Sequence, residues 1–173
     1  NHFVNEKPGY VRITGCDSNE QPQATGRIFN FNVKNYNILR NIIVDGTKSG
    51  TSSDLIGVYL YANDICEMCI VQGVNAGIYS SRGTPTDHFG ISRNCVSIAS
   101  SRPFYNVQVE NSIAIGNIGF YNNIAKNCIA IGGLQGFQNS TVHNSIAIGG
   151  YYGFGNCNLY NTISFASYIG VRG

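Results

Sequence analysis

The segments NSIAIGNIGF (111–120), NCIAIGGLQGF (127–137) and NSIAIGGYYGF (144–154) decide the fold of this chain. Related lines begin at Asn94 and Asn161, so the starting position advances by about 17 residues from one line to the next. A fixed period is typical of a solenoid, in which each repeat forms one coil and stacks on the next. A strand–helix unit needs about 30 residues. Coils this short therefore predict strands joined by tight bends.

The repeat continues towards the N-terminus in a looser form. Residues 68–79 and 41–59 each match the repeated line. They carry insertions at 47–54 and 82–88 that are rich in Gly, Ser, Thr, Asp and Pro. Such composition is typical of loops.

Residues 10–14 and 27–33 alternate like strands, and we assign them to one or two earlier coils. We expect a single domain over 1–173, with irregular coils in 1–93, regular coils in 94–173 and about seven or eight coils in all. The sequence shows no polar cap, which a solenoid needs at each open end. Either the chain is part of something longer, or neighbours cover its ends.

The alternation of side chains along a strand predicts which residues fill each coil. In N-x-I-A-I the Asn and both Ile share one face, and we expect that face to point inward. The expected inward columns are Ile113, Ile129, Ile146 and Ile163; Ile115, Ile131, Ile148 and Phe165; and Phe120, Phe137, Phe154 and Val171. A third short strand is indicated by Val109, Val142 and Leu159.

Two residue types mark the corners of the coils. Buried amides must use their donors and acceptors, so inward Asn residues are expected to bond to one another and to the corner backbone. The first Asn column is Asn94, Asn111, Asn127, Asn144 and Asn161, and a second is Asn106, Asn139 and Asn156. Glycines are expected to supply the positive φ of the bends; these are Gly116, Gly132, Gly149, Gly119, Gly136 and Gly153.

The Asn columns, the stacked Ile and Phe, and the run NIIVDGTKSGTSSDLIGVYL (41–60) resemble the right-handed parallel β-helices of pectate lyases, polygalacturonases and phage tailspikes. The resemblance covers the chain from about Tyr10 onward and implies that fold, which hosts enzymes, adhesins and virion parts alike. A left-handed β-helix is the alternative, but its hexapeptide period poorly fits the spacing of the repeated lines.

Charge and composition limit the partners. The net charge is +2 and charged residues make up 12% of the chain, so nothing indicates a nucleic-acid partner. No apolar run reaches the roughly 20 residues that span a bilayer, so we expect no membrane segment.

Acidic residues are scarce where the repeat is most regular. Glycosidases generally use two carboxylates, but Glu110 is the only acid between Asn94 and Gly173. We therefore assign no catalytic residue. The weak candidates for a lyase-like cluster of acids with an arginine base are Asp45, Asp64, Asp87, Arg82 and Arg93. Asp45 with Gly46 is more simply a turn.

The six cysteines are interpreted as mostly free thiols, because Cys69, Cys95 and Cys128 recur at one position of the repeat. That pattern fits synthesis in a reducing cytoplasm. Cys66 and Cys69 form a lone CxxC, whereas structural zinc needs four ligands. We therefore expect no metal and no cofactor, with Cys66 belonging to a bend.

The face opposite the isoleucines holds only small residues, and we expect it to face outward as a packing strip. The strip consists of Ser112, Ala114, Cys128, Ala130, Ser145 and Ala147. It suits a neighbouring rod or host surface, unless the chain's own loop or a missing segment covers it. We expect a homo-oligomer or a larger assembly, with a trimer implied by the tailspike resemblance.

The function that these patterns favour is a non-enzymatic structural or attachment module, such as a phage capsid decoration or fibre protein, in a virion or outside the cell. The alternatives are a polysaccharide lyase or glycoside hydrolase, or a fragment of one, and a carbohydrate-binding surface module. Tyr151 with Tyr152, and Tyr59 with Tyr61, could stack on the sugar rings of a glycan.

Overall fold

The computed structural model describes residues 2–7, 10–14, 27–30, 37–47, 55–81 and 89–173. This part of the chain is all-β. It contains no helix with the length and apolar character needed to cross a membrane. The loops expected at 47–54 and 82–88 lie, apart from Thr47, outside the described residues.

The strands form two sheets. The larger sheet has 13 strands: β1 His2–Lys7, β2 Tyr10–Thr14, β3 Arg27–Asn30, β5 Ile42–Asp45, β6 Ile56–Leu60, β8 Ile70–Ser80, β10 Val96–Tyr105, β12 Ile113–Tyr121, β14 Ile129–Gln138, β16 Ile146–Ile148, β17 Tyr152–Gly155, β19 Ile163–Phe165 and β20 Ile169–Arg172. The smaller sheet has seven strands: β4 Ile38–Arg40, β7 Ile65–Glu67, β9 Ile91–Arg93, β11 Gln108–Glu110, β13 Ile124–Lys126, β15 Thr141–His143 and β18 Asn158–Tyr160.

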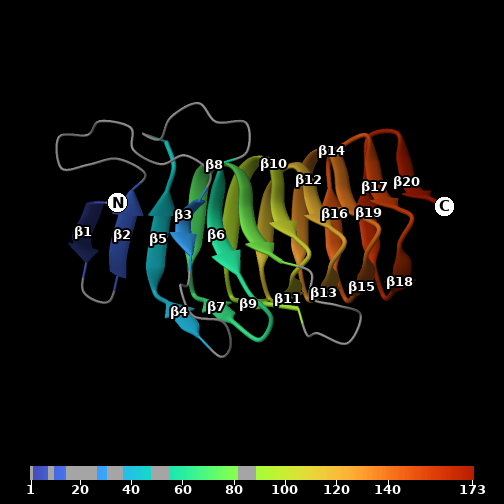
Figure 1. Ribbon diagram of the computed structural model, residues 1–173. Helices are drawn as coiled ribbons and strands as arrows, with labels where there is room; N and C mark the ends of the chain where they lie inside the picture. Colours follow the sequence, from blue (N-terminus) through green and yellow to red (C-terminus); the bar gives the residue numbers. More distant parts are fainter. Residues whose placement is uncertain (1, 8–9, 15–26, 31–36, 48–54, 82–88) are drawn as a thin grey trace.

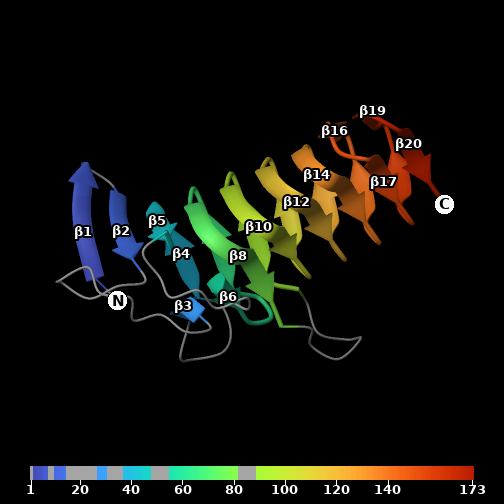
Figure 2. The same cartoon turned by 90° about the horizontal axis from the view of Figure 1, so that it is seen from above.

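The chain passes from one sheet to the other in each repeat, and the described strands pair in parallel except for β1 with β2. Figures 1 and 2 show the result as a row of strands that begins at β1 and β2 and ends at β19 and β20. A parallel stack of this kind is compatible with a β-helical solenoid. The strands expected at 10–14 and from Arg27 onward are present as β2 and β3.

The columns expected from the repeat are confirmed by the strand register. Ile113 pairs with Ile129, which pairs in turn with Ile146 and then Ile163. The phenylalanine column is the centre of the core, because Phe104, Phe120, Phe137 and Phe154 are buried and stacked ring on ring at centroid distances of 5.0, 4.6 and 5.2 Å. Val171, at the end of this column, is exposed.

The faces assigned to the N-x-I-A-I strand were wrong. Ile131 and Ile148 are 41% and 40% exposed, whereas Ala130 and Ala147 are fully buried. Alternation along the strand is intact, but the small residues point into the coil and the isoleucines point out.

The thinness of the coil explains this reversal. A Cβ added at Gly119 would lie only 3.0 Å from the Ala130 Cβ, and one at Gly136 would lie 2.8 Å from the Ala147 Cβ. The two arms of each long strand therefore pack alanine against glycine. So short a repeat encloses too little space near the corner for a second layer of large side chains.

Asparagine rather than glycine turns the corners. Asn111, Asn127 and Asn144 have φ of 50°, 54° and 48°, and the second column, including Asn139 and Asn156 at 50°, does the same at the other corner. Asn is the non-glycine residue that best tolerates this left-handed conformation. Of the glycines expected at the bends, only Gly149 has a positive φ; Gly119 and Gly136 serve the close packing described above.

The Asn side chains form the expected columns but, apart from the buried Asn106, lie exposed at the surface rather than inside, which corrects the inward assignment. The Asn127 Nδ2 donates to Asn111 Oδ1 at 3.0 Å, and Asn161 Nδ2 donates to Asn144 Oδ1 at 3.3 Å. The columns therefore link neighbouring coils through hydrogen bonds at the surface.

Candidate functional site

Asp45 belongs to a turn at the end of β5. Its Oδ1 accepts hydrogen bonds from the backbone and hydroxyl of Thr47 at 2.9 and 2.7 Å, and its Oδ2 accepts one from Gln72 at 3.1 Å. These contacts match the turn interpretation of Asp45 with Gly46.

Asp64 lies fully buried before β7, where its carboxylate orders the backbone. It accepts hydrogen bonds from the Asn37 backbone and side chain at 3.0 and 2.8 Å and from the Tyr61 backbone at 2.9 Å. Arg93 lies on β9 and forms an ion pair with Glu110 at 3.2 Å. Asp87 and Arg82 lie outside the described residues, and the candidates that are described have separate local partners.

The six residues expected to form an outward packing strip lie inside the coil. Ser112, Ala114, Cys128, Ala130, Ser145 and Ala147 are all at most 2% exposed. A partner cannot reach these side chains in the folded chain, so the expected interface does not lie on them.

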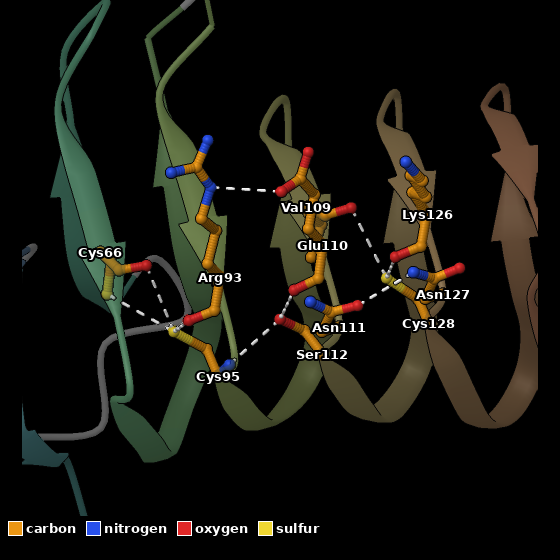
Figure 3. Close-up of polar contacts among 10 residues, drawn as sticks. All are labelled: Cys66, Arg93, Cys95, Val109, Glu110, Asn111, Ser112, Lys126, Asn127 and Cys128. Atoms are coloured by element: carbon orange, nitrogen blue, oxygen red, sulfur yellow. Dashed lines mark hydrogen bonds and ion pairs between the residues drawn. The ribbon is translucent and has the colours of Figure 1, made fainter.

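Ser and Cys residues that follow the corners Asn94, Asn111 and Asn127 stabilise them from within (Figure 3). The Ser112 hydroxyl donates to the Glu110 carbonyl at 2.8 Å and accepts from the Cys95 backbone N–H at 3.1 Å. The Cys128 thiol makes the equivalent contact with the Lys126 carbonyl at 3.2 Å. A small side chain with one donor thus satisfies corner backbone groups that would otherwise be buried without partners.

Three of the buried thiols come together between the sheets. Cys66 on β7 and Cys69 and Cys95 at the starts of β8 and β10 have their sulfur atoms within 4.8 Å of one another. The Cys95 and Cys66 sulfurs are 4.0 Å apart, and Figure 3 shows the two side chains pointing toward each other. All three are free cysteines with at most 1% exposure. Thiols so arranged could hold a thiophilic metal ion or form a disulfide.

The pKa values of the clustered thiols shift in opposite directions. Hydrogen bonding with Cys66 and Cys69 lowers the pKa of Cys95, against the opposing effect of burial. Hydrogen bonding with Cys69 and Cys95, together with burial, raises the pKa of Cys66 well above its usual value. A negative charge in this cluster is therefore held at Cys95 and stabilised by its two neighbours.

Sequence reasoning missed the contribution of Cys95 to the CxxC pair. Cys69 and Cys95 were placed in one column, which the register confirms, but that column was assigned to the outer face. Cys66 was assigned to a bend, yet it lies in β7 with its side chain buried. Two corrections would have predicted the cluster: the column of Cys69 and Cys95 had to face inward, and Cys66 had to be assigned to a strand rather than a bend.

On the outer face of the smaller sheet, one column of residues alternates in charge from Arg40 to Lys126. One residue from each strand lies in register, in the order Arg40, Glu67, Arg93, Glu110, Lys126, His143 and Tyr160. Arg40 and Glu67 form an ion pair, as do Arg93 and Glu110, and His143 stacks on Tyr160 at 4.4 Å. A shallow groove of about 330 Å³ runs beside Glu110, Lys126 and His143.

The outer face of the larger sheet is apolar. From β10 to β19 its two outward columns contain only Val, Ile and Phe: Val96, Ile113, Ile129, Ile146 and Ile163, and Ile98, Ile115, Ile131, Ile148 and Phe165. Exposure reaches 52% at Ile163 and 64% at Phe165. The outer face of the smaller sheet is more mixed, because it combines the charged column with a second column that contains the exposed Ile38 and Ile124.

Tyrosines form a third surface feature, beside the apolar columns. Tyr59, Tyr79, Tyr105 and Tyr121 lie in one column with centroid separations of 4.9 to 5.2 Å. Tyr59 also contacts Tyr61 edge to face at 5.3 Å. Near the C-terminal end Tyr151 stacks on Tyr168 at 4.4 Å, and both are exposed.

No protein-family model, curated protein or solved structure significantly matches this chain.

Proposed function

We propose that this chain is a right-handed parallel β-helix that acts as a non-enzymatic structural or attachment module and assembles through the outer face of its larger sheet. The observation that carries the proposal is the pair of apolar columns from β10 to β19. Monomeric proteins rarely leave contiguous apolar patches larger than a few hundred Å² exposed to water. Ten aliphatic or aromatic side chains in two straight rows are therefore expected to be covered.

The partner that fits best is a second copy of the chain. The two apolar columns repeat at the coil spacing. A second copy therefore presents isoleucines at the same spacing, and the side chains of the two copies can interdigitate. Identical chains usually close a symmetric oligomer, and the likeness to tailspike β-helices favours a trimer. The outer face of the smaller sheet is less suited to form this interface, because its charged side chains already pair with one another on the surface.

The virion setting, as a capsid decoration or fibre protein, rests on the resemblance to tailspikes. The buried free thiols are compatible with synthesis in a reducing cytoplasm.

The test is a matched pair of substitutions analysed by sedimentation velocity. Ile131 on the larger sheet and Ile124 on the smaller sheet are both 41% exposed. Ile131→Arg is expected to convert an oligomeric wild type to monomers with an unchanged circular-dichroism spectrum, whereas Ile124→Arg should remain oligomeric. A monomeric wild type at high concentration, or an Ile131→Arg variant that assembles normally, would contradict the proposal.

A glycan-binding module is the second candidate, and the exposed stack of Tyr151 and Tyr168 favours it because aromatic faces suit sugar rings. In that case Tyr151→Ala and Tyr168→Ala would abolish retention on an immobilised polysaccharide, while Ile131→Arg would not affect it.

A further inference from the structure

We propose that Cys66, Cys69 and Cys95 bind one Zn²⁺ ion inside the coil stack, with the Ser92 hydroxyl as the fourth ligand.

These four residues occupy neighbouring positions in the inner columns. On the smaller sheet the inward column runs in register through Leu39, Cys66, Ser92, Val109, Ala125, Val142 and Leu159. Only two members carry a polar atom, and these two are neighbours in adjacent coils. Across the corner from them lie Cys69 and Cys95, also in adjacent coils. Four potential metal ligands thus lie together in these two coils. In the regular coils, the positions opposite the corner hold aliphatic side chains instead.

The hydroxyl of Ser92 is buried beside the thiols. This side chain is fully buried, and its Oγ has no hydrogen-bond partner among the described residues. A buried hydroxyl without a partner costs roughly 1–3 kcal/mol, and valine or alanine occupies this position in the next coils. A polar neighbour of Ser92 is the Cys95 thiol, whose pKa the Ser92 side chain helps to lower, although the two side chains do not form a well-aligned hydrogen bond. Coordination of a metal ion would satisfy the Ser92 oxygen.

The distances between the sulfur atoms suit a shared ion. Zinc–sulfur bonds are about 2.3 Å long, so two sulfurs bound to one ion lie roughly 3.8 to 4.0 Å apart. The Cys66 and Cys95 sulfurs are 4.0 Å apart, and all three sulfurs lie within 4.8 Å of one another. Binding of one ion would require the more distant sulfurs to approach by at most about 1 Å.

Charge favours Zn²⁺ over Cu⁺, the other ion that thiolates select. Three thiolates around Zn²⁺ leave one net negative charge, whereas around Cu⁺ they leave two, and buried net charge is costly. An oxygen donor also suits zinc better than copper(I). Since the cluster is buried, the ion would bind during folding, with release of the three thiol protons to solvent.

The experiment is refolding of the full chain from denaturant under reducing conditions with Zn²⁺, followed by gel filtration and metal analysis. We expect about one zinc per chain and a loss of that zinc in Cys66→Val, a variant that places in β7 the residue found at positions 109 and 142. Cys66→Ser is the second variant, in case valine perturbs the packing. Cys128→Ser is the matched control, because Cys128 shares the column of Cys69 and Cys95 but lies outside the cluster, so it should retain zinc.

Cobalt supplies a readout of the ligands. Refolding with Co²⁺ should give thiolate-to-cobalt charge-transfer absorption in the wild type and in Cys128→Ser but not in Cys66→Val. The proposal is overturned if the wild type refolds without stoichiometric zinc, if it takes up only Cu⁺, or if Cys66→Val keeps its zinc. It is also overturned if protein isolated without reductant contains a Cys66–Cys95 disulfide.

Discussion

The corner that opens β8 and the corners that open β12, β14 and β16 have the same backbone but different side chains. Met68 has φ of 51°, close to the 50°, 54° and 48° of Asn111, Asn127 and Asn144. Each is followed by a buried Cys or Ser. Opposite that residue, however, the early coils place Cys66 and Ser92, whereas the regular coils place Val109, Ala125 and Val142.

This difference shows which positions of the coil are constrained and which can vary. The corners that open β8, β12, β14 and β16 each have a left-handed residue followed by a small inward side chain that contacts the corner backbone. The residue opposite must only be small enough to fit. The early coils use that freedom to bring together thiols and a hydroxyl, and the regular coils use it for apolar packing.

The largest expected effect tests the requirement for a small inward residue. Ala130 is fully buried, and the Cβ that a side chain at Gly119 would add lies 3.0 Å from its own Cβ. Ala130→Arg should therefore lower the free energy of unfolding by about 3–5 kcal/mol or more, because it overpacks the coil and buries an unpaired charge. Urea denaturation followed by circular dichroism measures this loss.

The control for that substitution is the adjacent residue on the other face. Ile131→Arg puts the same side chain on the outer surface and should change the stability of the monomer by less than about 1 kcal/mol. If both variants were equally stable, the inward and outward faces described for β14 would be wrong.

The outcome for the sequence-based predictions follows from the same geometry. A fixed period determines which residues share a column, so the Ile, Phe and Asn columns and the early strands could be predicted. Alternation fixes that Ile131 and Ala130 point to opposite faces, but it does not say which face is the interior. Hydrophobicity favoured isoleucine, and the narrow interior near the corner selected alanine. The thiol cluster was missed for this reason, because its third member was placed on the wrong side of the sheet.

Cys128, which lies outside the thiol cluster, should make the free energy of unfolding depend on pH. Burial raises the pKa of Cys128 from 9.0 to about 11. Below pH 9 the thiol is protonated in both the folded and unfolded chains, so its stabilising contribution is complete. Above pH 9 the unfolded chain loses this proton first, so the free energy of unfolding should fall by about 1.4 kcal/mol per pH unit until about pH 11.

Cys128→Ser should remove that part of the pH dependence, about 2–3 kcal/mol across the whole window. Serine already occupies the column at Ser112 and Ser145, where its hydroxyl makes the same contact with the corner carbonyl. Denaturant melts of both proteins between pH 8 and 10.5 measure the difference. Identical slopes would show that Cys128 ionises as readily in the folded chain as in the unfolded one.

The smallest expected effect is a gain in stability at the corner formed by Met68. Met68 adopts the left-handed conformation with a flexible side chain that is 40% exposed, at a position where other coils have asparagine. Non-glycine residues in this region cost about 1–3 kcal/mol, and asparagine pays the least of them. Met68→Asn should therefore raise the free energy of unfolding by about 0.5–1 kcal/mol, measured by thermal and urea denaturation. The reverse change, Asn111→Met, should cost more than this gain, because it also removes the Oδ1 atom that accepts the hydrogen bond from Asn127 at 3.0 Å. If Met68→Asn were neutral while Asn111→Met were destabilising, the asparagines would be needed for the hydrogen bonds between coils rather than for the conformation of the corner.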